Sequence, residues 1–86
     1  MPASPLPPLR PALDAGFARS LAAAAGLDEL RDWLRRYRDD GVGADAMTQH
    51  LQHLLAACAD EATQDRLLEL LDLATGFCPP QARIWP

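Results

Sequence analysis

Two histidines and two cysteines are the residues of this chain best suited to bind a metal ion. His50 and His53 are three residues apart, a spacing that brings two imidazoles together on one helix face. A closed zinc site needs four ligands, however, and no CxxC element or further histidine accompanies the pair. Cys58 follows eight residues after His50, on the apolar face of the same predicted helix. We therefore interpret the histidines as surface or boundary residues and predict no metal or other cofactor.

Arginines alternate with aromatic residues in the segment RDWLRRYR, which spans residues 31–38. Some nucleic-acid-binding proteins show such a pattern. Trp33 and Tyr37, however, share one helix face with Leu30 and Leu34, while the arginines point outward. The net charge of −4, from eight arginines and twelve acidic residues, also opposes nucleic-acid binding. Packing of the aromatics in the core is the favoured interpretation.

Catalytic nucleophiles are not recognisable in this sequence. Ser20 and Thr48 lack the sharp glycine-rich turn that exposes a catalytic hydroxyl, and neither cysteine has a flanking signature. We predict that the protein is not an enzyme.

Acidic residues are concentrated in the second half of the chain. Residues 44–86 hold six acidic residues and two arginines, whereas the charges of residues 1–43 cancel. Glu61, Asp65, Glu69 and Asp72 follow one another at spacings of four, four and three, which places them along one helix face. This acidic stripe is either a solvated surface, a face neutralised by the arginines of residues 31–38, or a docking surface for a basic partner.

The composition favours helices over strands. Leu and Ala dominate the apolar residues, which make up 49% of the chain, while Val and Ile occur once each. We predict an all-α fold, a small four-helix and mostly antiparallel bundle. The expected helices are residues 12–25, residues 28–39 with Asp28 as the N-cap, residues 44–59, and a fourth helix that ends at Thr75 with Asp60 as its N-cap.

The boundary between the last two helices depends on the phase of the apolar pattern, because no glycine or proline separates them. Extending the stripe of Leu51, Leu54 and Cys58 would turn Glu61 and Asp65 into the core, so a turn near Asp60 is favoured over one continuous helix. Leu68 and Leu73 widen the apolar face of the fourth helix, which predicts that it is covered on more than one side.

Prolines and glycines define the ends of the molecule. We expect a proline-rich leader at residues 1–11, a helical domain at 12–77, and an extended arm at 78–86. Gly76 should close the last helix in a left-handed conformation, with Phe77 packed back on its last turn. Trp85 is either a core residue or a binding anchor. A disulfide between Cys58 and Cys78 is disfavoured, and the absence of a secretory signal predicts a cytoplasmic protein.

The C-terminal half resembles short bacterial proteins in which two helices precede a glycine, an aromatic residue and a cysteine-proline turn, here DRLLELLDLATGFCPPQARIW. Some small helical proteins of this kind are immunity partners of toxins. The resemblance implies a protein-binding domain that neutralises a basic toxin. Its partner-binding residues would be Glu61, Asp65, Glu69, Asp72 and Trp85. The alternative is a self-associating helical adaptor or regulatory subunit that forms a homodimer; neither hypothesis involves a membrane.

Overall fold

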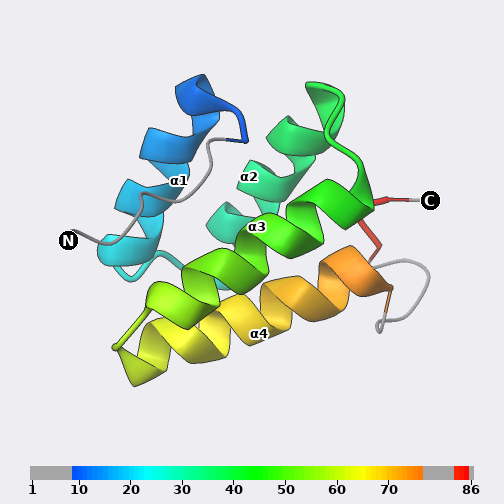
Figure 1. Cartoon of the computed structure of the whole chain (residues 1–86). Coiled ribbons are helices and arrows are strands. Elements are labelled where there is room, and N and C mark those ends of the chain that lie inside the picture. The colour runs from blue at the N-terminus through cyan, green and yellow to red at the C-terminus, as the bar shows by residue number, and fades with distance from the viewer. Residues whose placement is uncertain (1–8, 77–82, 86) are drawn as a thin grey trace, which may run out of the picture.

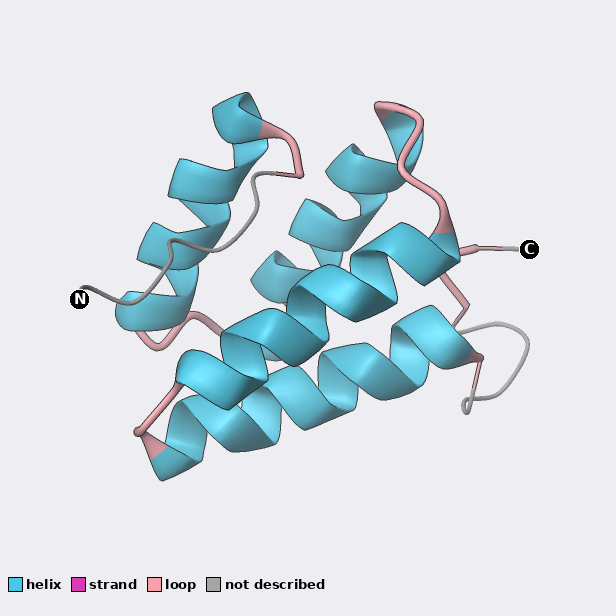
Figure 2. Cartoon of the chain, viewed as in Figure 1, coloured by secondary structure: helices cyan, strands magenta, loops and turns pink. Residues whose placement is uncertain are grey.

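The computed structural model describes residues 9–76 and 83–85, and these residues form four α-helices without strands. The helices are α1 (Pro11–Ala22), α2 (Leu27–Asp39), α3 (Ala44–Ala57) and α4 (Glu61–Thr75). Helices α3 and α4 lie side by side, and α1 and α2 stand across them (Figure 1, Figure 2). The predicted all-α class is confirmed.

Helix α1 begins one residue earlier and ends three residues earlier than predicted. Pro11, assigned to the leader, is its first residue, where a missing N–H is tolerated. At the other end, Ala24 adopts a left-handed backbone with φ of 56°. The amide of Ala25 then donates to the carbonyl of Ser20 at 3.0 Å, which completes a Schellman turn. An alanine occupies the position that glycine normally takes, which is why we misplaced this end.

The start of α2 also differs from the prediction. Gly26 is the N-cap, not Asp28. Asp28 and Glu29 lie in the first turn instead, where a negative charge interacts favourably with the helix dipole. The second helix therefore begins at Leu27, one residue before the predicted start.

The turn between α3 and α4 confirms that this segment is not one continuous helix. Cys58 has extended φ and ψ, so α3 ends at Ala57, two residues earlier than predicted. Asp60 is the predicted N-cap of α4: its carboxylate accepts hydrogen bonds from the amide of Thr63 at 2.9 Å and from the Thr63 hydroxyl at 2.7 Å. These bonds lower the pKa of Asp60. The chain reverses here, although a mostly antiparallel arrangement of all four helices stays a prediction.

The core lies where the four helices meet and includes one residue of the C-terminal arm. Tyr37, Leu30 and Leu34 are fully buried, as predicted, and Val42 and Met47 join them. Ile84 of the arm is 2% exposed. The end of the arm therefore packs on the helices. Gly76 has φ of 86°, as predicted for the end of α4, whereas Phe77 and Cys78 lie outside the described residues. Other core members are Phe17, Leu21, Leu51, Leu67, Leu70, Leu73 and Ala74.

Gly16 and Trp33 bring α1 and α2 together. A Cβ atom on Gly16 would lie only 2.3 Å from the Cη2 atom of the Trp33 ring. The indole N–H donates to the Ser20 hydroxyl at 2.8 Å, and the Arg36 guanidinium stacks on the ring at 4.4 Å. The glycine, which weakens a helix by itself, is therefore required here for close packing.

Candidate protein-binding surface on α4

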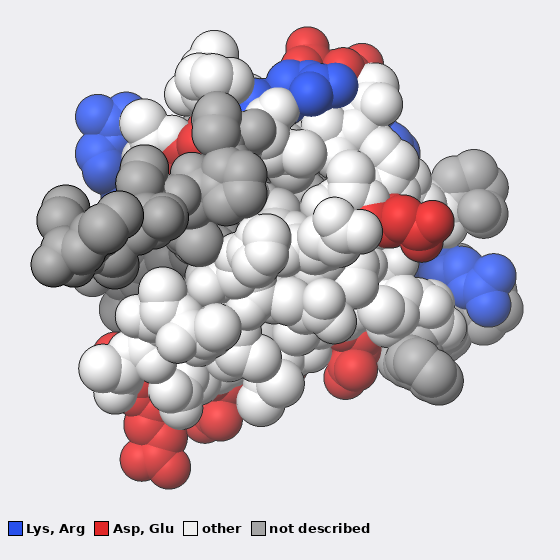
Figure 3. Space-filling view, in the orientation of Figure 1, with Lys and Arg blue, Asp and Glu red and all other residues white. Residues whose placement is uncertain are grey.

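The four carboxylates of the acidic stripe are exposed on α4, on the side opposite its buried residues. In Figure 3, separate acidic groups lie along the lower edge of the molecule, over α4, with uncharged atoms between them. Glu69 pairs weakly with Arg66 of the same helix, at 3.9 Å. Each like-charged pair at these spacings costs a few tenths of a kcal/mol, roughly. Among the described residues, the pair between Arg66 and Glu69 offsets only part of this repulsion.

Arginines of α2 do not neutralise the stripe in the part of the chain that the structure describes. Arg35 pairs with Asp32 at 2.6 Å, and Arg38 pairs with Asp39 at 3.0 Å, both within α2. Internal neutralisation by these residues, one of the interpretations of the sequence, therefore has no support from their contacts.

Leu68 lies within the acidic stripe. It follows Asp65 by three residues and precedes Asp72 by four, so the three side chains share one face of α4. The side chain is 50% exposed, and Leu68 is the one large hydrophobic residue classed as exposed among those described. The two leucines predicted that this helix is covered on more than one side; Leu73 is buried, but the cover does not extend to Leu68. The apolar pattern could not distinguish them, because both widen the same face.

Trp85 lies apart from the acidic stripe. Its indole N–H donates to the carbonyl of Val42 at 2.8 Å, and its half-buried ring packs against the core. The adjacent carbonyl of Ile84 accepts a hydrogen bond from Arg38 at 3.0 Å. These bonds fasten the arm to α2 and to the loop before α3. The structure thus brings together the four predicted carboxylates but not the tryptophan.

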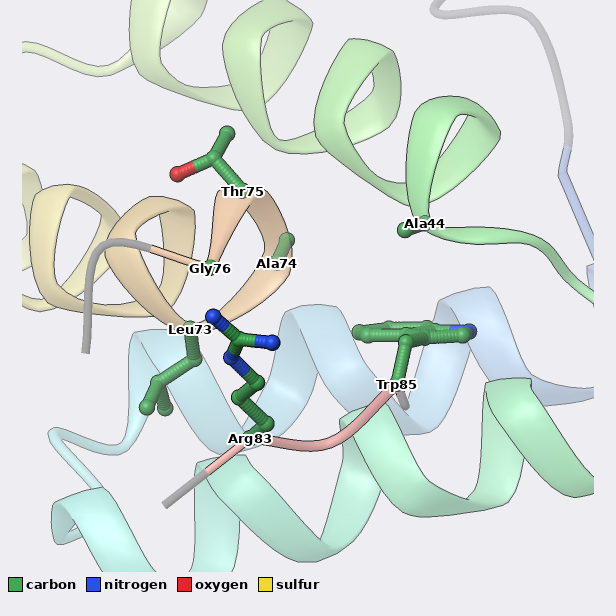
Figure 4. A pocket seen from close by; sticks show the side chains of 7 residues that line it. All are labelled: Ala44, Leu73, Ala74, Thr75, Gly76, Arg83 and Trp85. Carbon is green, nitrogen blue, oxygen red and sulfur yellow. The ribbon is translucent and has the colours of Figure 1, made fainter. Parts of the chain in front are cut away.

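A pocket of about 230 Å³ separates Trp85 from the end of α4 (Figure 4). The Arg83 side chain extends toward Gly76, and the Trp85 ring lies below Ala44. A cation at this end of a helix interacts favourably with the partial negative charge of the last carbonyls. Arg83 is therefore placed to stabilise α4 as well as to line the pocket. The remaining lining residues are Leu73, Ala74 and Thr75.

A polar cluster inside the molecule connects three helices. Asp14 of α1 accepts a hydrogen bond from the Tyr37 hydroxyl of α2 at 2.6 Å, and Nε2 of His50 in α3 lies 3.9 Å from the same carboxylate oxygen. The prediction that His50 is a surface or boundary residue was wrong, since its side chain is 7% exposed; His53 is exposed. Helical spacing could not predict this burial, because it cannot show that Asp14 of α1 and Tyr37 of α2 lie beside His50.

Hydrogen bonds and burial shift the ionisation of this cluster. Burial raises the pKa of Asp14, but the bonds from Tyr37 and from the amides of Leu9 and Arg10, with a contribution from His50, lower it overall. Burial lowers the pKa of His50, although Asp14 opposes this shift. Burial and the bond to Asp14 raise the pKa of Tyr37. The Asp14 carboxylate therefore links α1 and the residues before it to α2 and α3.

The described residues contain neither a candidate metal site nor a disulfide. No group of three histidine, cysteine or acidic side chains there is placed to hold a metal ion. Cys58 is free, and its thiol donates to the Asp60 carbonyl at 3.4 Å. Within those residues, too, no helix combines the length and apolar character needed to cross a membrane.

Comparisons with protein-family models, curated proteins and solved structures found no match for this chain. The resemblance of the C-terminal half to immunity-type proteins therefore stays a prediction.

Proposed function

We propose that the chain is a non-enzymatic, cytoplasmic protein-binding domain that uses the outer face of α4 to hold a basic protein. The observation that carries the proposal is the exposed leucine within a line of carboxylates: Leu68 is half exposed between Asp65 and Asp72. An apolar side chain that loses its contact with water on binding supplies affinity, and surrounding charges supply specificity and faster association. The resemblance to immunity proteins makes a basic toxin the favoured partner.

Charge and hydrophobicity should contribute to different steps of binding. Exposed carboxylates attract a basic partner before contact, so their effect falls as salt screens the charges. A leucine acts only after contact, when its apolar surface is buried. In this proposal Trp85 supports the fold, because its hydrogen bond and packing are already made within the chain.

Capture from a lysate of the organism that encodes the chain tests the proposal. We expect the native chain to retain a basic protein, and the Asp65→Lys/Asp72→Lys variant to lose it. Asp28→Lys/Glu29→Lys is the matched control, because it reverses two exposed carboxylates of α2 and should retain the partner. A captured protein that is not basic, or one that binds both variants equally, would contradict the proposal.

Binding kinetics with the captured protein then separate the two contributions. Glu69→Lys/Asp72→Lys should slow association and flatten its salt dependence, while Leu68→Ala should mainly accelerate dissociation. Because Leu68 is exposed, its replacement should leave the melting temperature nearly unchanged. An unchanged dissociation rate in Leu68→Ala would show that Leu68 is not part of the interface.

Self-association is the second candidate function, and the uncharged surface of α3 favours it. Asp45 is the one acidic residue of this helix, which contains no lysine or arginine, and Figure 3 shows a broad surface over α3 with few charges. Two copies that each carry a net charge of −4 repel each other, and this repulsion is weakest when the faces that meet carry few charges. A dimer would give a melting temperature that rises with concentration, and Ala46→Glu, which adds charge to this face, should abolish the rise. A melting temperature independent of concentration would exclude it.

A further inference from the structure

An uncharged groove lies where the C-terminal end of α1 faces the α3–α4 pair. Its volume is about 270 Å³, and none of its lining residues is charged; they include Leu21 and Ala22 of α1, Leu54 of α3, Cys58 of the turn and Leu67 of α4. Helix α1 packs chiefly on α2, which leaves the groove open between α1 and the other two helices. The carboxylates of the acidic stripe do not line it, so this surface is separate from the one proposed to bind a partner.

The groove exposes apolar surface of residues that also belong to the packed interior. Leu54 and Cys58 are both half-buried and pack against the core, yet they line the open groove as well. An uncharged segment that lies in the groove would remove this remaining surface from water without burying an unpaired charge.

The chain before α1 is held on the side of the helix that faces the core. The amide of Leu9 donates to the Asp14 carboxylate at 2.9 Å, and the amide of Arg10 donates to the same carboxylate at 3.2 Å. The Leu9 side chain packs against the core, as does Leu21 of the groove. The residues before Leu9 therefore approach α1 on the side where the groove lies.

The length of the N-terminal segment, residues 1–8, matches the distance to the groove. These eight residues, MPASPLPP, lie outside the described residues and contain four prolines and no charged side chain. The lining residues of α1 begin at Ala18, so they lie roughly 14–20 Å from Leu9 at 1.5 Å per helical residue. A proline-rich segment extends about 3.1 Å per residue, which places Ser4 about 15 Å from Leu9. Residues near Ser4 can therefore reach the groove.

We propose that the N-terminal segment of the chain docks in this groove and covers Leu54 and Cys58. An uncharged segment fits the uncharged lining, whereas a basic partner finds no carboxylate there. Because the segment is tethered at Leu9, its effective concentration is in the millimolar range or above, so weak contacts suffice to hold it. Its prolines also restrict the free segment, which reduces the conformational entropy lost on docking.

A competition between two thiols in the full chain tests the docking. In the variant Ser4→Cys/Arg19→Cys/Cys78→Ser, the thiol introduced at position 4 can form a disulfide either with Cys58 in the groove or with the thiol at position 19. Arg19 is exposed and lies about 15 Å from Leu9 along α1, so the tether reaches both partners. Under mild oxidation in dilute solution, we expect mainly the disulfide with Cys58, although this residue is half-buried. Equal pairing, or a preference for the exposed thiol, would overturn the proposal. Disulfide-linked dimers would assign the groove to a second copy and would overturn it as well.

The reactivity of Cys58 provides an independent measurement. In Cys78→Ser, Cys58 is the one remaining thiol of the chain, and its reaction rate with a thiol reagent reports how far it is covered. Ala3→Asp places a charge in the docked segment and should raise this rate on the order of tenfold, because burial of an unpaired polar group opposes docking by about that factor. Ala12→Asp is the matched control, since it adds the same charge at an exposed position of α1 and should leave the rate unchanged. An unchanged rate in Ala3→Asp, or an equal rise in both variants, would contradict docking of the segment.

Discussion

Substitution of Gly16 by alanine should destabilise the protein, although alanine is the better helix former. In an unhindered helix the change would stabilise by about 1 kcal/mol. Here the new Cβ would lie 2.3 Å from Cη2 and 2.9 Å from Cζ2 of Trp33, well inside the ~3.5–4.0 Å optimum for carbon atoms. Either the ring moves or α1 separates from α2.

Two contacts oppose movement of the ring. The indole N–H would leave the Ser20 hydroxyl, and the Arg36 guanidinium would lose its stacking partner. Overpacking typically costs about 1–3 kcal/mol, and a lost hydrogen bond about 0.5–1.5 kcal/mol. After subtraction of the helix-propensity gain, the free energy of unfolding should fall by roughly 1–3 kcal/mol.

Urea unfolding followed by circular dichroism measures this change, and a double-mutant cycle identifies its cause. In a Trp33→Leu background the ring atoms that meet the new Cβ are gone. Gly16→Ala should there stabilise by up to ~1 kcal/mol, the propensity value. A stabilising Gly16→Ala in the native background, or the same loss in both backgrounds, would refute the role assigned to Trp33.

Three further substitutions test the ends of helices and the arm. Gly76→Ala should lower the free energy of unfolding by roughly 1 kcal/mol, because φ of 86° strains a residue with a side chain. Ala24→Gly should raise the free energy of unfolding by a roughly similar amount, because it relieves the same strain at φ of 56°. If both substitutions changed the free energy of unfolding in the same direction, this account would be contradicted. Trp85→Ala should cost about 2 kcal/mol, less than the 3–5 kcal/mol of a fully buried aromatic, with Trp85→Phe restoring part of it. An unchanged melting temperature of Trp85→Ala would return Trp85 to the candidate binding residues.

Local signals in the sequence determined the helical class, the turn at Asp60 and the left-handed end at Gly76. Each of these depends on residues near one another in the chain. The side chain of Asp60 caps an amide three residues later, and Gly76 adopts the left-handed conformation directly after the last turn of α4. The stripe from Glu61 to Asp72 was equally predictable, because helical spacing alone places these carboxylates on one face.

Tertiary packing decided the features that depend on which helix covers which face. Leu68 and Leu73 have the same residue type and both extend one apolar face, yet only the arrangement of the other helices leaves Leu68 exposed. His50 is buried beside Tyr37 of α2 and Asp14 of α1, and Asp14 is 36 residues away in sequence. Trp85 reaches the carbonyl of Val42 across an even longer separation. Periodicity describes one helix at a time, so contacts between distant segments lie beyond it.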